Sequence, residues 1–165
     1  MAEHATESLI TDEMRAAIGK ESEPWTCEVD RIQVRMFARA VGHTAPVFYD
    51  EEAAKQAGYR SLLAPPGYLG TPVFDPNKSD ATSGRRAQLL PQPRRPLNRR
   101  LNGGTEIEYF ADICAGDVLK ARSRLASVDE RTGSIGQMLI TTTETIYTNQ
   151  HGETVAIMRG TGILY

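Results

Sequence analysis

The spacing of apolar residues divides the chain into two halves. In the first half they follow a helical period, whereas in the second half they alternate with polar residues, as in strands. Capping residues and glycine stops refine the helices of the first half. The predicted elements there are a helix Asp12–Ile18 capped by Thr11, a strand Trp25–Val29, a helix from the cap Asp30 through Val41, and a helix Glu51–Ala57 capped by Asp50.

The second predicted helix is the longest of the three. Its apolar positions mostly lie near one face, as in an amphipathic helix. They are Ile32, Val34, Met36, Phe37, Ala40 and Val41. After the third helix, two prolines lead into Gly67, and this pattern predicts a turn followed by a further helix.

The second half predicts a series of strands joined by short turns. The strands are Thr105–Phe110, Val118–Val128, Gln137–Tyr147 and Thr154–Leu164, and the turns are Cys114–Asp117, Asp129–Gly133 and Asn149–Gly152. In Val118–Val128 one face carries Leu119, Ala121, Ser123 and Leu125, and the other carries Lys120, Arg122 and Arg124. Helices followed by an antiparallel meander predict a single α+β domain over residues 1–165. One or two helices cannot cover both faces and edges of such a sheet, so we expect dimerisation.

Composition and charge limit the compartment and the partners expected for this protein. The chain has 165 residues, 40% of them apolar and 24% charged, with a net charge of −2, which gives no overall attraction to nucleic acid or an anionic membrane. No apolar run approaches the roughly 20 residues that span a bilayer, and the N-terminus lacks signal-peptide features. Cys27 and Cys114 lie far apart and indicate reduced thiols. We therefore expect a cytoplasmic protein without nucleic-acid or membrane partners.

Positive charge concentrates in a proline-rich loop at about residues 75–100. Its prolines exclude a regular helix. Guanidinium groups match phosphate oxygens, so this loop is a candidate phosphate clamp, with a solvated surface loop as the alternative. The candidate residues are Arg94, Arg95, Arg99 and Arg100.

Several familiar site patterns are absent from the sequence. There is no GxGxxG, GxxxxGK[ST] or GxSxG motif, and three histidines with two distant cysteines make a metal site improbable. We therefore expect no metal and no cofactor other than a coenzyme A thioester bound as substrate.

The segment Phe37–Ala54 carries a resemblance to a known family. Gly42, Pro46, Val47 and Ala54 keep the spacing of the active segment of MaoC-like acyl-CoA hydratases and dehydratases. Three positions depart from that pattern: His43 stands where the family has Asp, Ala45 replaces Asn, and Phe48 replaces the catalytic His.

Further stretches resemble the N-terminal type of MaoC-like dehydratase domain, so the similarity covers roughly residues 10–165. They are Arg99–Gly104, Ala115–Val118 and Gly152–Ala156, while Leu63–Gly67 resembles the family's strand-to-helix entry. The resemblance implies a hot-dog fold, with a sheet wrapped around a central helix. It also implies that two hot dogs pair to build the site, and that the adjacent hot dog often supplies the Asp/His dyad.

The resemblance implies a subunit of an enoyl-CoA hydratase or 3-hydroxyacyl thioester dehydratase in fatty acid metabolism. Phe48 has no titratable proton, so it and Pro66 are expected to line the substrate pocket, while the Gly67 amide faces the thioester oxygen. His43 is either a base or a cation at a helix C-terminus.

Three alternatives remain open. The first is a self-sufficient homodimeric hydratase that uses His43, or Asp50 or Glu51. The second is a non-catalytic acyl-CoA-binding protein, and the third is a thioesterase that uses a carboxylate.

Overall fold

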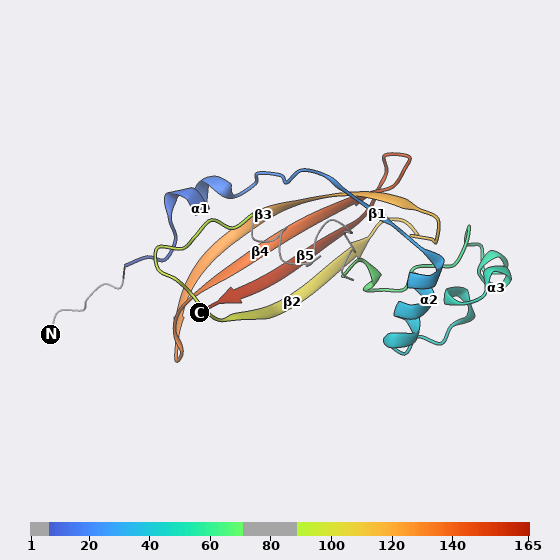
Figure 1. Cartoon of the computed structure of the whole chain (residues 1–165), viewed down its shortest axis with the longest axis horizontal. Coiled ribbons are helices and arrows are strands. Elements are labelled where there is room, and N and C mark those ends of the chain that lie inside the picture. The colour runs from blue at the N-terminus through green and yellow to red at the C-terminus, as the bar shows by residue number, and fades with distance from the viewer. Residues whose placement is uncertain (1–6, 71–88) are drawn as a thin grey trace.

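A computed structural model of the chain describes residues 7–70 and 89–165. The helices and strands follow one another in the order that the sequence pattern predicts (Figure 1). The helices are α1 (Asp12–Ala17), α2 (Arg31–Ala40) and α3 (Glu51–Gln56), with short 3₁₀ turns η1 (Pro46–Phe48) and η2 (Tyr68–Gly70). The strands are β1 (Trp25–Glu28), β2 (Arg100–Tyr109), β3 (Val118–Gly133), β4 (Gly136–Thr148) and β5 (Thr154–Leu164).

The strands form one five-stranded sheet in the order β1-β3-β4-β5-β2, and every pairing is antiparallel. Strands β3, β4 and β5 are the predicted meander, and β1 and β2 lie at the two edges. The predicted α+β class is confirmed, as is the inward face of β3, where Leu119, Ala121, Ser123 and Leu125 are buried.

The structure corrects two predicted boundaries. The segment Asp129–Gly133 is not a turn, because β3 and β4 stay paired as far as Gly133↔Gly136 and only two residues join them. Strand β2 begins at Arg100 rather than at Thr105. This strand includes Gly103, where the sheet leaves no room for a side chain: a Cβ on Gly103 would lie 2.9 Å from Thr161 Cγ2.

Helix α2 packs through a narrower stripe than its apolar pattern predicts. Val34 and Ala38 are buried, but Ile32 is 64% and Met36 66% exposed. Of the apolar positions expected to lie mostly near one face, Ile32, Met36, Ala40 and Val41 are exposed, so the expectation was wrong for these positions. The reason is that α2 lies against one end of the sheet and packs only through the side that carries Val34, Phe37 and Ala38 (Figure 1).

The buried residues form two clusters at opposite ends of the sheet. One joins α2 and the 62–69 segment to β3, β4 and β5, and the other joins α1 to Leu139 and Leu164. Figure 1 shows α1 along one end of the sheet, with α2 and α3 beyond the other. The helix expected after Gly67 is seen within the described residues as the short 3₁₀ turn η2 (Tyr68–Gly70). The first part of the basic loop falls in residues 71–88, which lie outside the described residues.

Two smaller findings complete the fold. Cys27 and Cys114 are not joined by a disulfide bond. Within residues 7–70 and 89–165 no helix is both long and apolar enough to cross a bilayer.

Candidate functional site

The two positions of the expected dyad lie side by side. The rings of His43 and Phe48 have centroids 5.3 Å apart at 46°. Phe48 is only 8% exposed, so its own chain already covers most of the ring. The backbone amide of His43 donates to Ala38 O at 2.9 Å and closes the end of α2. The two dyad positions are thus adjacent, but they are occupied by an imidazole and a phenyl ring, and neither carries a carboxylate.

The two carboxylates considered as alternative bases, Asp50 and Glu51, have local partners. Asp50 Oδ1 accepts the Ala53 amide at 2.8 Å and caps α3. Glu51 Oε1 accepts Ser61 Oγ at 2.9 Å and lies 3.4 Å from Arg31 Nη2. The second oxygen of Glu51 is buried and has no hydrogen-bond partner among the described residues.

Gly67 occupies a turn that needs glycine, because its φ is +86°. Its amide donates to the hydroxyl of Tyr109, at the end of β2, at 3.0 Å. Phe37 of α2 closes the other side: its Cζ would lie 3.5 Å from a Cβ on Gly67. Pro66, just before this turn, is exposed.

The neighbouring Tyr68 anchors the same turn in the core. Its ring meets Phe37 edge to face, with centroids 5.9 Å apart, and its hydroxyl donates to Gln33 Oε1 at 3.1 Å. Burial raises the pKa of Tyr68 to about 12, so the phenol stays neutral near physiological pH. Gly67 is thereby held between α2 and the end of β2.

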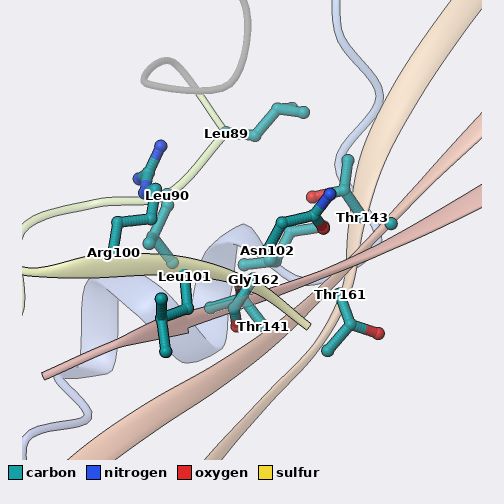
Figure 2. Close-up of a pocket in the computed structure, with 11 residues that line it drawn as sticks. Leu89, Leu90, Arg100, Leu101, Asn102, Thr141, Thr143, Thr161 and Gly162 are labelled. Atoms are coloured by element: carbon teal, nitrogen blue, oxygen red, sulfur yellow. Dashed lines mark hydrogen bonds between the residues drawn. The ribbon is translucent and has the colours of Figure 1, made fainter. Parts of the chain in front are cut away.

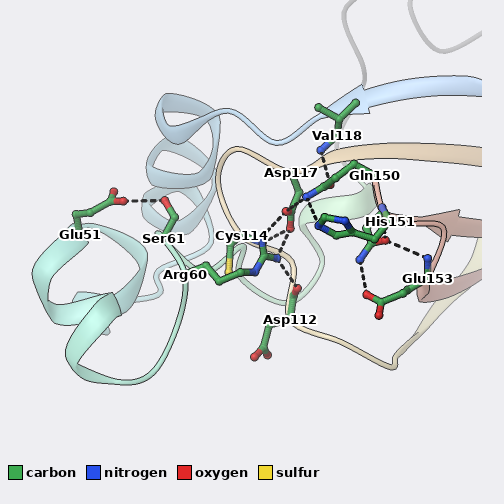
Figure 3. A network of polar contacts seen from close by, with 11 residues as sticks. Glu51, Arg60, Ser61, Asp112, Cys114, Asp117, Val118, Gln150, His151 and Glu153 are labelled. Carbon is green, nitrogen blue, oxygen red and sulfur yellow. Dashed lines mark hydrogen bonds and ion pairs between the residues drawn. The ribbon is translucent and has the colours of Figure 1, made fainter.

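A buried carboxylate ties the segment before Gly67 to the turn before β3 (Figure 3). Asp117 is 1% exposed and accepts two bonds from Arg60, at 2.7 and 2.8 Å. It also accepts the Cys114 amide at 2.8 Å and Gln150 Nε2 at 3.2 Å. Backbone bonds run parallel to this network, from Ala64 N to Ile113 O and from Ala115 N to Leu62 O, both 2.8 Å.

Two groups of this cluster, Asp117 and Cys114, have shifted pKa values. Burial acts to raise the pKa of Asp117, but hydrogen bonds from Arg60, Cys114 and Gln150 outweigh it and hold the pKa below its ordinary value. Burial raises the pKa of the Cys114 thiol, so this cysteine is a poor nucleophile.

The predicted phosphate-binding arginines fall into two pairs. Arg94 donates to Ser8 O at 2.9 Å and lies 3.0 Å from Glu7, and Arg95 donates to Gln137 at 3.0 Å, so both are engaged locally. Arg99 lies 6.0 Å from the centre of the Tyr165 ring. Arg100 lines a hollow on the sheet, beside Leu89, Leu90, Leu101 and Asn102 (Figure 2). Among the described residues no carboxylate pairs with Arg99 or Arg100.

One chain does not bring all the predicted site residues together. Arg100 begins β2 and Tyr109 ends it. Nine strand steps of about 3.4 Å separate these ends by roughly 30 Å. The sequence analysis did not single out Tyr109. The one feature that could have indicated it is its aromatic side chain near the end of a predicted strand.

Comparisons with known proteins agree with this architecture. A family model described as FAS1-like, dehydratase domain region, matches residues 16–158. A UPF0336 protein from Parafrankia sp. (strain EAN1pec) is 36% identical over 131 residues, which cover 78% of each chain.

Two solved structures superpose well on the chain. One is a truncated HadBC (3R-hydroxyacyl-ACP dehydratase) complex from Mycobacterium tuberculosis, with a TM-score of 0.67 and 28% identity over 89% of this chain and 96% of that one. The other is a MaoC-like dehydratase, with a TM-score of 0.73 and 25% identity over 92% of this chain and 43% of that one. These superpositions confirm the predicted hot-dog fold.

Proposed function

Because the chain belongs to the FAS1-like dehydratase domain family, we propose that it is the substrate-binding, dyad-lacking half of a hot-dog hydro-lyase. Its substrate would be a 3-hydroxyacyl or 2-enoyl thioester of coenzyme A. The observation that carries the proposal is Phe48, a buried ring packed on His43 at the place where the resemblance expects a catalytic histidine.

The reaction explains why this replacement matters. In hydration, a base takes a proton from water as its oxygen attacks C3 of the enoyl thioester, and an acid delivers a proton to C2. Hydrogen-bond donors meanwhile stabilise the negative charge on the thioester oxygen. Phe48 performs neither proton transfer, but the Gly67 turn retains a donor. This chain would therefore hold the thioester while a partner moves the protons.

The sheet offers a partner a free edge. Strand β2 lies at the edge and is largely exposed, so its outer backbone groups are available for pairing. Antiparallel pairing with a similar strand would place the start of the partner strand beside Tyr109. The HadBC structure is a complex of hot-dog dehydratase chains, and the MaoC-like dehydratase contains more chain beside the part that matches. The HadBC complex supports a paired arrangement for this chain.

Arg99 and Arg100 are proposed to hold the phosphates of the coenzyme, because Arg94 and Arg95 are engaged locally. Replacing both Arg99 and Arg100 with alanine is expected to weaken acyl-CoA binding several-fold at low salt and to flatten its salt dependence, since exposed ion contacts are screened. Calorimetric titration at two salt concentrations measures this. Arg39→Ala, at an exposed position of α2, is the control. A double variant with unchanged affinity and salt dependence would remove the clamp from the account.

A self-sufficient enzyme is the second candidate, and the unpartnered buried oxygen of Glu51 favours it. In that case His43 or Glu51 would act as the base.

The dyad-lacking proposal predicts that His43→Ala leaves the hydration rate of an active preparation unchanged within about twofold, because no proton passes through this imidazole. A large fall in kcat at unchanged stability would favour the second candidate. Tight acyl-CoA binding without turnover beside every hot-dog partner would favour a binding protein.

Co-expression with a catalytic hot-dog subunit tests the proposal. The natural first choice is a MaoC-like chain with an intact Asp/His motif encoded beside this one. Crotonyl-CoA hydration should appear in the purified pair and should be lost when the partner's catalytic histidine is replaced. A pair that stays active after that replacement would place the chemistry elsewhere.

A further inference from the structure

The amide of Gly67 is already occupied. It donates to the hydroxyl oxygen of Tyr109 at 3.0 Å, so a thioester oxygen cannot accept from the same amide while the phenol stays in place. If the chain binds a thioester, as the proposed function requires, two arrangements are open. Either the phenol moves aside and the Gly67 amide binds the thioester oxygen, or the phenol itself makes the contact with that oxygen.

The main chain around Tyr109 is held firmly. Tyr109 pairs with Ala156 of β5, and the next amide, of Phe110, donates to Val155 O at 2.9 Å. Tyr109 as a whole residue remains 41% exposed, so solvent and ligands can reach part of it. Phe37 closes the opposite side of Gly67. The Gly67 amide is therefore engaged by the phenol oxygen and is not a bare donor at this turn.

We propose that the Tyr109 hydroxyl is the donor to the thioester carbonyl oxygen, and that the Gly67 amide positions and polarises it. A phenol hydroxyl carries one proton and can accept a second bond. When the Tyr109 oxygen accepts from the Gly67 amide, the hydroxyl proton remains available to donate to a bound thioester. Successive hydrogen bonds polarise one another, so the amide strengthens the phenol as a donor.

The ionisation of Tyr109 is compatible with this role. Burial raises the pKa of its phenol, so the proton stays on the oxygen near neutral pH. No proton is transferred: the hydroxyl donates a hydrogen bond to the developing oxyanion and keeps its proton throughout. Tyr109 would thus be a stabilising group and would not replace the missing dyad.

A spectroscopic probe separates the two arrangements without turnover. The probe is 2,4-hexadienoyl-CoA, whose conjugated absorption moves to longer wavelength when a donor polarises its carbonyl. Bound to the wild-type chain, it should show this red shift. Tyr109→Phe keeps the ring and removes the donor, so most of the red shift should disappear while the Kd rises by no more than about tenfold. Tyr59→Phe, a half-buried phenol beyond α3, is the matched control and should keep the shift.

In the active pair with a catalytic subunit, Tyr109→Phe is further expected to lower kcat about 100-fold with little change in KM, as for loss of one oxyanion donor. Thermal unfolding of the variant checks that it folds. A red shift that persists or grows in Tyr109→Phe would overturn the proposal, because the Gly67 amide would then take the carbonyl directly. Absence of probe binding to the wild-type chain would instead overturn the proposed function itself.

Discussion

Replacing Asp117 with alanine is expected to lower the free energy of unfolding by about 2–3 kcal/mol. The substitution leaves the Cys114 amide without its acceptor and Arg60 without its partner. Because the Arg60 side chain is 57% exposed, water can solvate it, and the loss stays below that of a fully buried pair. Urea denaturation measures the change. Asp112→Ala is the control: that residue is exposed, its carbonyl accepts from Arg60, and its carboxylate acts on Arg60 only through space, so its cost should be within about 0.5 kcal/mol.

The same carboxylate predicts the direction of a pH effect. Its pKa in the folded chain lies below the ordinary value of 3.8, so the stability it contributes is present above that value and is lost as pH falls toward the folded pKa. Glu144, held by Arg124 and Arg159, contributes in the same direction. Asp117→Asn should therefore show a smaller loss of stability than wild type between neutral pH and pH 3. Parallel curves would contradict the assigned network.

Tyr68→Ala is expected to be the most destabilising single change in the site, at about 3–5 kcal/mol. The ring is 2% exposed and packs on Phe37, so its removal leaves a cavity beneath the Gly67 turn. Tyr68→Phe keeps the ring and loses only the bond to Gln33, and should cost about 1 kcal/mol. Thermal unfolding of both variants measures the difference. Equal losses would mean that the hydroxyl, rather than the packed ring, anchors the turn.

Local chemistry made much of the fold predictable. Thr11, Asp30 and Asp50 cap the three helices as expected, because a side-chain oxygen that accepts a free amide acts within a few residues. The strict alternation in β3 likewise located its buried face.

Predictions that depended on distant contacts were less reliable. The exposure of Ile32 and Met36 follows from where α2 meets the sheet, which periodicity alone does not determine. The segment after Val128 is rich in turn-forming residues, yet pairing with β4 keeps it extended to Gly133. In both cases tertiary packing overrides a local preference.

In the candidate site, too, local motifs were predictable and contacts between distant residues were not. The resemblance located Gly67 and the dyad positions, because motif spacing survives changes of residue. It did not locate Tyr109, which lies 42 residues from Gly67 in sequence and meets it only in the folded chain. Nor does the sequence distinguish Arg94 and Arg95, which donate to Ser8 and Gln137, from Arg99 and Arg100.

The central claim is that this chain holds an acyl thioester but lacks the groups that move its protons. The most direct test is to titrate crotonyl-CoA into the chain alone by calorimetry and to follow the enoyl absorbance of the same sample. We predict saturable binding with no loss of that absorbance until a catalytic hot-dog subunit is added. Loss of absorbance in the chain alone, at a rate proportional to its concentration, would contradict the claim.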